Sequence, residues 1–326
     1  MMKRKYSILI LLTIVFFSCM KKEKPVPLPE PGEMQTVEIE IGYPYLYQVY
    51  YDCESNTVVK RNTKYDWDIA FECASQGYHV LLNNATGMLA AIITDLSFEA
   101  VGTSNISNAQ WKWDAPSGNL DSTAIEDWRL KSNIYIINRQ YDDNGNHLGY
   151  FKLQCLSVNS TAYVFRFAGI DGSNDKTVTI SKNPLINFIH FSFNGGGKEM
   201  ELEPPKNDWD LLFTNHHHKF DNLTLPFVLT QVLTNKHNGV KAAEANNNLF
   251  YSVVLKDTAN NNFTDYWDEI GYDWKIRNSI DNSFTIDPNK YFLVKTVAGL
   301  YYKIKFIDFY NSTGKKGYPR FLIQKL

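Results

Sequence analysis

A run of three histidines offers side chains that could bind a metal, within Asn215-His216-His217-His218-Lys219. If this run is a strand, its side chains alternate between two faces, so His216 and His218 share one face. Two imidazoles on one face could bind Zn²⁺, Ni²⁺ or a haem iron. If the run is a loop, all three imidazoles are solvated, because a His-rich tract is only a compositional indication of metal binding. The sequence leaves both interpretations open.

Two further side chains could act as ligands to iron. His237 lies in the polar segment Thr234–Gly239, which reads as a turn. Met88 follows a similar polar segment in the first half of the chain and is a rough counterpart of His237. The ordinary interpretations are a solvated turn histidine and a methionine that fills a core.

Signatures of catalysis and of nucleic-acid binding are absent from the sequence. It contains no Gly-x-Ser-x-Gly elbow, no phosphate-binding loop and no His-Glu-x-x-His pair. The formal net charge is −2, whereas a nucleic-acid surface needs a basic domain. We therefore predict a binding protein that is not an enzyme and has no nucleic-acid partner.

A repeated hexapeptide indicates how the chain is organised. Asp66-Trp67-Asp68-Ile69-Ala70-Phe71 returns as Asp208-Trp209-Asp210-Leu211-Leu212-Phe213. An internal repeat points to a duplicated structural unit. We predict two tandem β-domains, residues 36–185 and residues 186–326.

The segments between turns have the period of two that is typical of half-buried strands. In the first hexapeptide this period places Trp67, Ile69 and Phe71 on one face, toward the core, and the aspartates at backbone amides of the strand start. Helical patterns are few and short, at 122–127 and 240–245. We predict an all-β fold of mostly antiparallel sheets with few short helices.

The N-terminus indicates export and a lipid anchor. A basic head precedes an apolar run, residues 6–17, which is too short to span a bilayer and typical of a signal peptide. The run ends at Ser18-Cys19, the pattern of a bacterial lipoprotein processing site. We predict that residues 1–19 are a lipoprotein signal peptide with lipidated Cys19, and that residues 20–35 are a Pro/Lys-rich tether. An ordinary signal peptide is the alternative.

This N-terminus predicts a protein of the bacterial cell envelope, in the outer membrane, held by lipid alone. Three cysteines remain after Cys19, namely Cys53, Cys73 and Cys155. The envelope permits disulfides, and Cys53 could bridge to Cys73 if their strands pair. Because three is an odd number, at least one thiol is free or paired elsewhere.

Four ordered segments of the second repeat match a known pattern: His190–Phe193 with the glycine turn behind it, Asn207–Phe213, Lys290–Val294, and Tyr302–Tyr310 with Lys316-Gly317-Tyr318. In this order they resemble the HmuY family of haem-binding bacterial lipoproteins. The first repeat matches more loosely, through 66–71 and 151–156. The resemblance covers nearly the whole chain after the N-terminal segment.

The resemblance implies an all-β protein that captures haem outside the cell and works with an outer-membrane receptor. Members of the family hold the haem iron with two axial side chains, His or Met. The corresponding stretches of this chain, 278–300 and 131–139, contain neither residue type. The family's ligands therefore do not carry over. The remaining candidate ligands for haem or a metal are His216, His218, His237 and Met88.

A surface module that binds glycans or proteins without haem is the second function class that we consider. Exposed tyrosine and tryptophan side chains can stack on sugars or anchor a protein partner. Such residues cluster at 43–51 and at 266–274. Titration with haemin separates the two classes, because only a haem protein shifts the Soret band.

Overall fold

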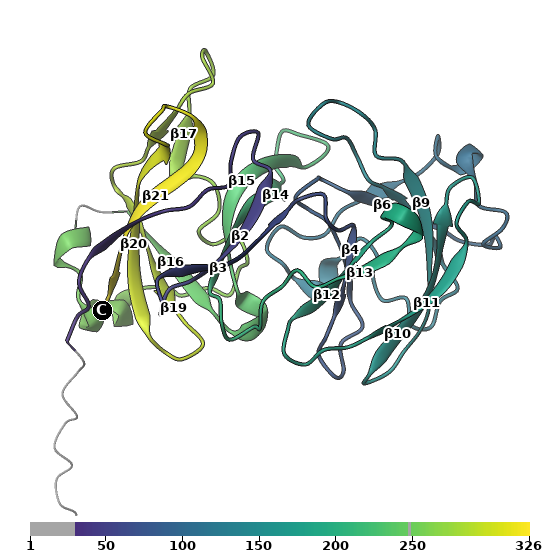
Figure 1. The fold of residues 1–326 in the computed structure, drawn as a ribbon, viewed down its shortest axis with the longest axis horizontal. Helices are drawn as coiled ribbons and strands as arrows, with labels where there is room; N and C mark the ends of the chain where they lie inside the picture. The colour runs from purple at the N-terminus through teal and green to yellow at the C-terminus, as the bar shows by residue number, and fades with distance from the viewer. Residues whose placement is uncertain (1–29, 247–248) are drawn as a thin grey trace, which may run out of the picture. The chain divides into compact units, whose positions relative to one another are not determined.

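Antiparallel strands make up most of the regular secondary structure of the protein, which confirms the all-β prediction (Figure 1). A computed structural model describes residues 30–246 and 249–326. The strands group into two modules by their hydrogen-bonded pairing and by the hydrophobic clusters that they bury.

One module consists of a single stretch of chain, residues 66–206, and is named the inserted module. Its strands are β4 (Ile69–Glu72), β5 (Val80–Leu82), β6 (Leu89–Ile93), β7 (Trp111–Lys112), β8 (Ile134–Asn138), β9 (Tyr150–Val158), β10 (Ala162–Gly169), β11 (Lys176–Ser181), β12 (Phe188–Ser192) and β13 (Lys198–Met200). They form two sheets with the strand orders β13-β12-β4-β5 and β11-β10-β9-β8-β6-β7.

The other module consists of two stretches, residues 31–65 and 207–326, and is named the split module. Its strands are β1 (Gln35–Glu38), β2 (Tyr47–Asp52), β3 (Thr57–Thr63), β14 (Leu211–His218), β15 (Phe227–Thr234), β16 (Lys241–Asn246), β17 (Lys275–Arg277), β18 (Phe284–Ile286), β19 (Lys290–Lys295), β20 (Tyr301–Tyr310) and β21 (Lys316–Lys325). The sheet orders are β15-β14-β2-β3, β1-β21-β20-β19-β16 and β17-β18.

Helical structure within the described residues is limited to short 3₁₀ turns. These are η1 (Thr103–Asn105), η2 (Leu120–Ser122), η3 (Asn194–Gly196), η4 (Lys236–Asn238), η5 (Phe250–Ser252) and η6 (Leu255–Asn260). The prediction of a helix at 240–245 is wrong, because this segment forms β16 beside β19. The predicted helix at 122–127 is also wrong, since only the last residue of η2 falls within it.

The repeated strands exchange partners between the two repeats. The first copy of the hexapeptide leads into β4, which pairs with β12 from the second repeat, with Ile69 opposite Phe191 (Figure 1). The second copy leads into β14, which pairs with β2 from the first repeat, with Leu211 opposite Tyr51. β1 likewise pairs with β21, so three sheets combine strands from both sides of the boundary that we predicted at 185/186. That domain boundary stays a prediction.

One aspartate in each copy of the hexapeptide binds an amide next to the exchanged strand. Asp68 Oδ2 accepts a hydrogen bond from the Phe193 amide at 2.6 Å, and Asp210 Oδ2 accepts one from the Cys53 amide at 3.0 Å. Asp66 Oδ2 accepts one from the Thr63 amide at 2.7 Å. The prediction that these carboxylates bind backbone amides is confirmed.

The tryptophans of the hexapeptide do not share a face with the residues that follow them. Ile69 and Phe71 are fully buried in the core of the inserted module, whereas Trp67 packs in a separate cluster with Ala70 and Phe188. The second copy repeats this arrangement, with Trp209 beside Tyr50 in a cluster of its own. Our prediction for Trp67 is wrong because β4 begins only at Ile69, so the strand alternation does not extend back to the tryptophan.

The three described cysteines are buried free thiols. Cys73 and Cys155 belong to the core of the inserted module, and Cys53 belongs to that of the split module. The bridge between Cys53 and Cys73 is therefore not formed. Burial raises the pKa of all three thiols, so they stay protonated.

Candidate ligand-binding site

The hairpin of β14 and β15 extends well beyond its counterpart in the inserted module. β14 pairs with β15 from Leu211 opposite Thr234 to His218 opposite Phe227. The equivalent pair, β4 with β5, ends after three residue pairs. The extension carries the histidine run and a tip at 219–226 that has no counterpart in the first repeat.

A groove with a volume of about 680 Å³ lies against this extended hairpin. The volume is within the range of roughly 300–1,000 Å³ that is typical of sites for drug-sized ligands. Most of its lining is apolar or aromatic: Tyr43, Tyr45, Phe220, Leu223, Phe227, Val228, Leu229, Tyr272 and Phe284, together with Asn215, Thr230 and Asn282. Phe227 and Tyr43 are more than half exposed, so a ligand could cover them.

Three cationic side chains also line the groove, namely Lys275, Arg277 and Lys316. Arg277 Nε donates to Asn282 Oδ1 at 3.1 Å, and the Lys316 ammonium donates to the Asn282 carbonyl. Lys275 is 7% exposed and its Nζ donates to the Thr230 carbonyl at 2.7 Å. Burial lowers the pKa of Lys275 to about 7, since a charged ammonium is poorly solvated there.

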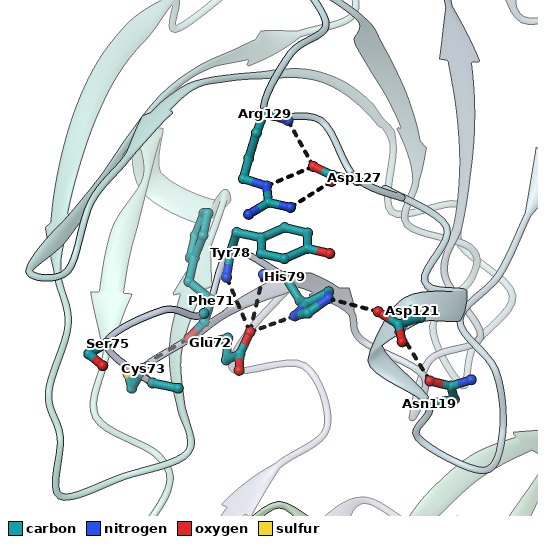
Figure 2. Close-up of polar contacts among 12 residues, drawn as sticks. Phe71, Glu72, Cys73, Ser75, Tyr78, His79, Asn119, Asp121, Asp127 and Arg129 are labelled. Atoms are coloured by element: carbon teal, nitrogen blue, oxygen red, sulfur yellow. Dashed lines mark hydrogen bonds and ion pairs between the residues drawn. The ribbon is translucent and has the colours of Figure 1, made fainter.

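The corresponding place in the inserted module is filled by side chains (Figure 2). Tyr78 lies two residues before Val80, the first residue of β5, as Thr230 lies two residues before the equivalent Val232 of β15. The Arg129 guanidinium carbon lies 3.5 Å from the centre of the Tyr78 ring. Arg129 also donates to both carboxylate oxygens of Asp127, at 2.9 and 2.7 Å. The open groove is thus a feature that the two repeats do not share.

Beside this stack, His79 joins two acidic side chains (Figure 2). Its Nδ1 is 2.6 Å from Glu72 Oε2, and its Nε2 is 3.7 Å from Asp121 Oδ1. Burial opposes ionisation of Glu72, but hydrogen bonds from His79 and from backbone amides lower its pKa overall. Glu72 is therefore a carboxylate that orients the imidazole of His79.

The histidine run divides between the groove and the contact of the two modules. His218 packs against Phe220 and Tyr272, both of which line the groove, with ring centres 4.7 Å apart in each case. His216 Nε2 is 3.0 Å from the Pro116 carbonyl, and His217 Nε2 is bonded to the Asp114 carbonyl. Burial lowers the pKa of His216 to about 4 and that of His217 to about 3, so both are neutral at pH 7.

The segment of the inserted module that meets these histidines fits closely against Trp267. The Ser117 carbonyl accepts hydrogen bonds from the Trp267 amide at 2.9 Å and from Lys236 Nζ at 3.0 Å. Gly118 has φ of +68°, and a Cβ at this position would lie 2.7 Å from the Trp267 ring. His216 and His217 thus belong to a packed contact between modules.

His237 lies at an interior cavity of about 50 Å³ between the modules. His190, Trp209 and Trp267 also line this cavity. Burial lowers the pKa of His237 and of His190 to about 3, so both are neutral. The volume suits a few water molecules and is far below that of a site for a large planar ligand.

Met88 is 1% exposed and lies in the core of the inserted module. Its amide donates to the Asn83 carbonyl, as the Val240 amide donates to the Asn235 carbonyl. Met88 therefore corresponds to Val240 rather than to His237. The structure does not bring Met88 to the groove.

Cys19, the predicted lipidation site, lies outside the described residues. Within residues 30–246 and 249–326, no helix has the length and apolar character needed to cross a membrane. In the same residues, no three His, Cys, Asp or Glu side chains are grouped so as to hold a metal ion.

The cations of the groove were not among the candidates from the sequence. Asp273-Trp274-Lys275 was visible as a repeat of Asp127-Trp128-Arg129, without a functional meaning. One signal in the sequence could have indicated the groove. The segment after the second hexapeptide is longer than the segment after the first, and its additional residues form one wall of the groove.

Comparison with known proteins gives one family over most of the chain. The model of the HmuY protein family matches residues 45–322. No curated protein matches the sequence significantly.

Solved structures with a similar chain course include the apo HmuY analogue of Tannerella forsythia, with 12% identity, a TM-score of 0.30, and coverage of 92% of this chain and 98% of that chain. Apo PinO from Porphyromonas gingivitis has 12% identity, a TM-score of 0.28, and coverage of 90% and 97%. A protein from Bacteroides vulgatus described as HmuY-like and heme-binding has 11% identity, a TM-score of 0.25, and coverage of 89% and 90%. These TM-scores are low, so the family match carries the assignment.

Proposed function

Because this chain belongs to the HmuY family, we propose that it binds haem and captures it outside the cell. The observation that carries the proposal for this chain is the groove of about 680 Å³ beside the extended hairpin. Haem is a flat, largely apolar ring with two carboxylates at one edge. Aromatic walls suit the ring, and Arg277 and Lys316 suit the carboxylates.

His218 is the side chain that we propose as a ligand to the haem iron. It is the one residue of the four candidates whose ring packs against groove residues, Phe220 and Tyr272. Within the described residues neither of its ring nitrogens has a hydrogen bond. A neutral imidazole nitrogen is a common ligand for iron.

The first test is a titration with haemin, followed through the Soret band. The wild-type protein should shift and sharpen this band at micromolar haemin. His218→Ala should change the position of the band and weaken binding, because it removes a nitrogen ligand from the iron. His147→Ala is the matched control: His147 is a half-buried histidine of the inserted module, bonded to Asn138, and its removal should leave the spectrum unchanged.

A wild-type protein that leaves the Soret band unshifted would overturn the proposal. It would favour the alternative of a surface module for glycans or proteins, which the exposed aromatics of the groove would serve equally well. A spectrum that His218→Ala leaves unchanged would keep haem binding and remove His218 from the iron.

We also propose that the protein is a lipoprotein of the cell envelope, anchored through Cys19, and that it passes haem to an outer-membrane receptor. The support is the Ser18-Cys19 junction after an apolar run, together with membership of the family. Cys19→Ser should abolish incorporation of a radioactive fatty acid, since the thiol is the acceptor. Cys155→Ser is the control and should be labelled like the wild type. Labelling that persists in Cys19→Ser would refute the anchor.

A further inference from the structure

Lys275 is a buried ammonium group that lacks an acidic partner. Its side chain lines the groove, and Nζ donates to the carbonyls of Thr230 and Tyr272, at 2.7 and 3.2 Å. Within the described residues, no carboxylate lies within ion-pair distance of it. Buried charges in proteins are ordinarily paired, because leaving water without compensation is costly. A lysine ammonium has three donors, so these two bonds leave one donor unused.

The inserted module carries a cationic side chain at the position equivalent to Lys275, and there the cation has two partners and no groove beside it. Arg129, which follows a buried tryptophan as Lys275 does, is ion-paired with Asp127 and covered by Tyr78 (Figure 2). In the split module the equivalent acid, Asp273, is 2.6 Å from Lys290 Nζ instead. The tyrosine is replaced by Thr230. Both partners of the arginine are therefore missing at Lys275.

We propose that Lys275 binds an acidic group of the ligand in the groove, so that the groove selects planar ligands that carry a carboxylate. This inference rests on the proposed function and adds that the Lys275 amine recognises the edge of the haem ring that carries the carboxylates. The ring centres of Trp274 and Phe309 lie 4.4 and 5.2 Å from Nζ, so the surroundings of the amine are apolar. A carboxylate of the ligand would meet the unused donor of Nζ in an apolar setting, where charge-assisted hydrogen bonds are strong.

A proton should accompany the ligand. The pKa of Lys275 is lowered to about 7 by burial, so the amine is partly neutral at pH 7. A bound carboxylate favours the ammonium form, which raises this pKa, so the complex takes up a proton. The other titratable groups around Lys275 are Asp273, which favours the ammonium, Arg277 and Lys316, and the phenols of Tyr45, Tyr272 and Tyr310. Affinity should therefore be highest below pH 7 and fall as the pH rises above it.

The experiment compares haemin with its dimethyl ester, in the full chain and in two variants. The wild-type protein should bind haemin roughly tenfold or more tightly than the ester, the ratio expected from one charge-assisted hydrogen bond. Lys275→Met keeps the apolar stem and removes the amine. This variant should weaken the binding of haemin by about the same factor and leave the binding of the ester unchanged. Calorimetry of haemin binding near pH 7, in buffers of different ionisation enthalpy, should show proton uptake in the wild type and none in Lys275→Met.

Lys303→Met is the matched control. Lys303 is 2% exposed and its Nζ donates to the carbonyls of Phe250 and Val253, at 2.9 and 3.0 Å, but it does not line the groove. This variant should keep the preference for haemin and the proton uptake.

The outcomes separate the two proposals. If haemin and the ester bind equally tightly, or if Lys275→Met weakens both alike, the role of Lys275 is overturned while haem binding stands. If haemin does not bind at all, the proposed function is wrong and the role of Lys275 falls with it.

Discussion

A fragment of residues 66–206 should fold on its own, whereas a fragment of residues 36–185, of nearly the same length, should not. The first fragment contains every strand of two complete sheets and the whole main core of the inserted module. The second fragment lacks β12, so β4 keeps only β5 as a partner. It also contains β1 and the β2–β3 hairpin without β21 and β14, the strands that pair with β1 and β2.

Circular dichroism and thermal unfolding of both fragments would test this expectation. The fragment 66–206 should show a strand spectrum and a cooperative transition, since a domain of this size can bury enough apolar surface to be stable. The fragment 36–185 should show neither. A cooperative transition in 36–185 and its absence in 66–206 would contradict the division into modules and support the boundary at 185/186.

Asp68→Ala should lower the free energy of unfolding by about 3–5 kcal/mol, the usual effect of removing one partner of a buried ion pair. Asp68 is 1% exposed, and its Oδ1 accepts a hydrogen bond from Arg139 Nε at 2.7 Å. Its Oδ2 binds the Phe193 amide of the exchanged strand. Without the carboxylate, the buried guanidinium of Arg139 loses its ion-pair partner and the Phe193 amide loses its acceptor.

The second copy of the hexapeptide provides the control for Asp68. Asp210 also binds an amide of an exchanged strand, that of Cys53, but no arginine contacts it in the described part of the chain. Asp210→Ala should therefore lower the free energy of unfolding by only about 1–3 kcal/mol, the effect of one unsatisfied buried group. Urea unfolding measures both values. Equal losses in the free energy of unfolding would contradict the prediction, because they would mean that the ion pair with Arg139 adds no measurable stability.

Local features of the fold were accessible from the sequence. A period of two marks a half-buried strand because successive side chains point to opposite faces, and that signal is contained in a few residues. The role of Asp68 and Asp210 at backbone amides followed from the chemistry of a carboxylate beside a strand start.

Which strands pair with one another could not be predicted from the sequence. β4 could pair with β2 or with β12, and both have apolar alternation, so only the three-dimensional arrangement decides. The error at 240–245 has a related cause. Its alanines favour a helix by intrinsic propensity, yet pairing with β19 outweighs that preference.

The groove could not be predicted from the sequence for a similar reason. Its lining comes from four distant parts of the chain, near residues 43–45, 215–230, 272–284 and 316. No local pattern connects them. The histidine run was visible, but whether each ring faces the groove or the other module depends on the segment 114–117, which lies about a hundred residues earlier.

The exchange of strands has a consequence for the order in which the protein can assemble during the export that we propose. A chain that crosses a membrane from its N-terminus presents β1 and β2 first, but their partners, β21 and β14, emerge only after the whole inserted module. The inserted module can complete itself in the interval. During this time the first strands have unpaired edges, and other chains can form hydrogen bonds with them. The proposed export would therefore leave these strand edges open to aggregation until the final strand has emerged.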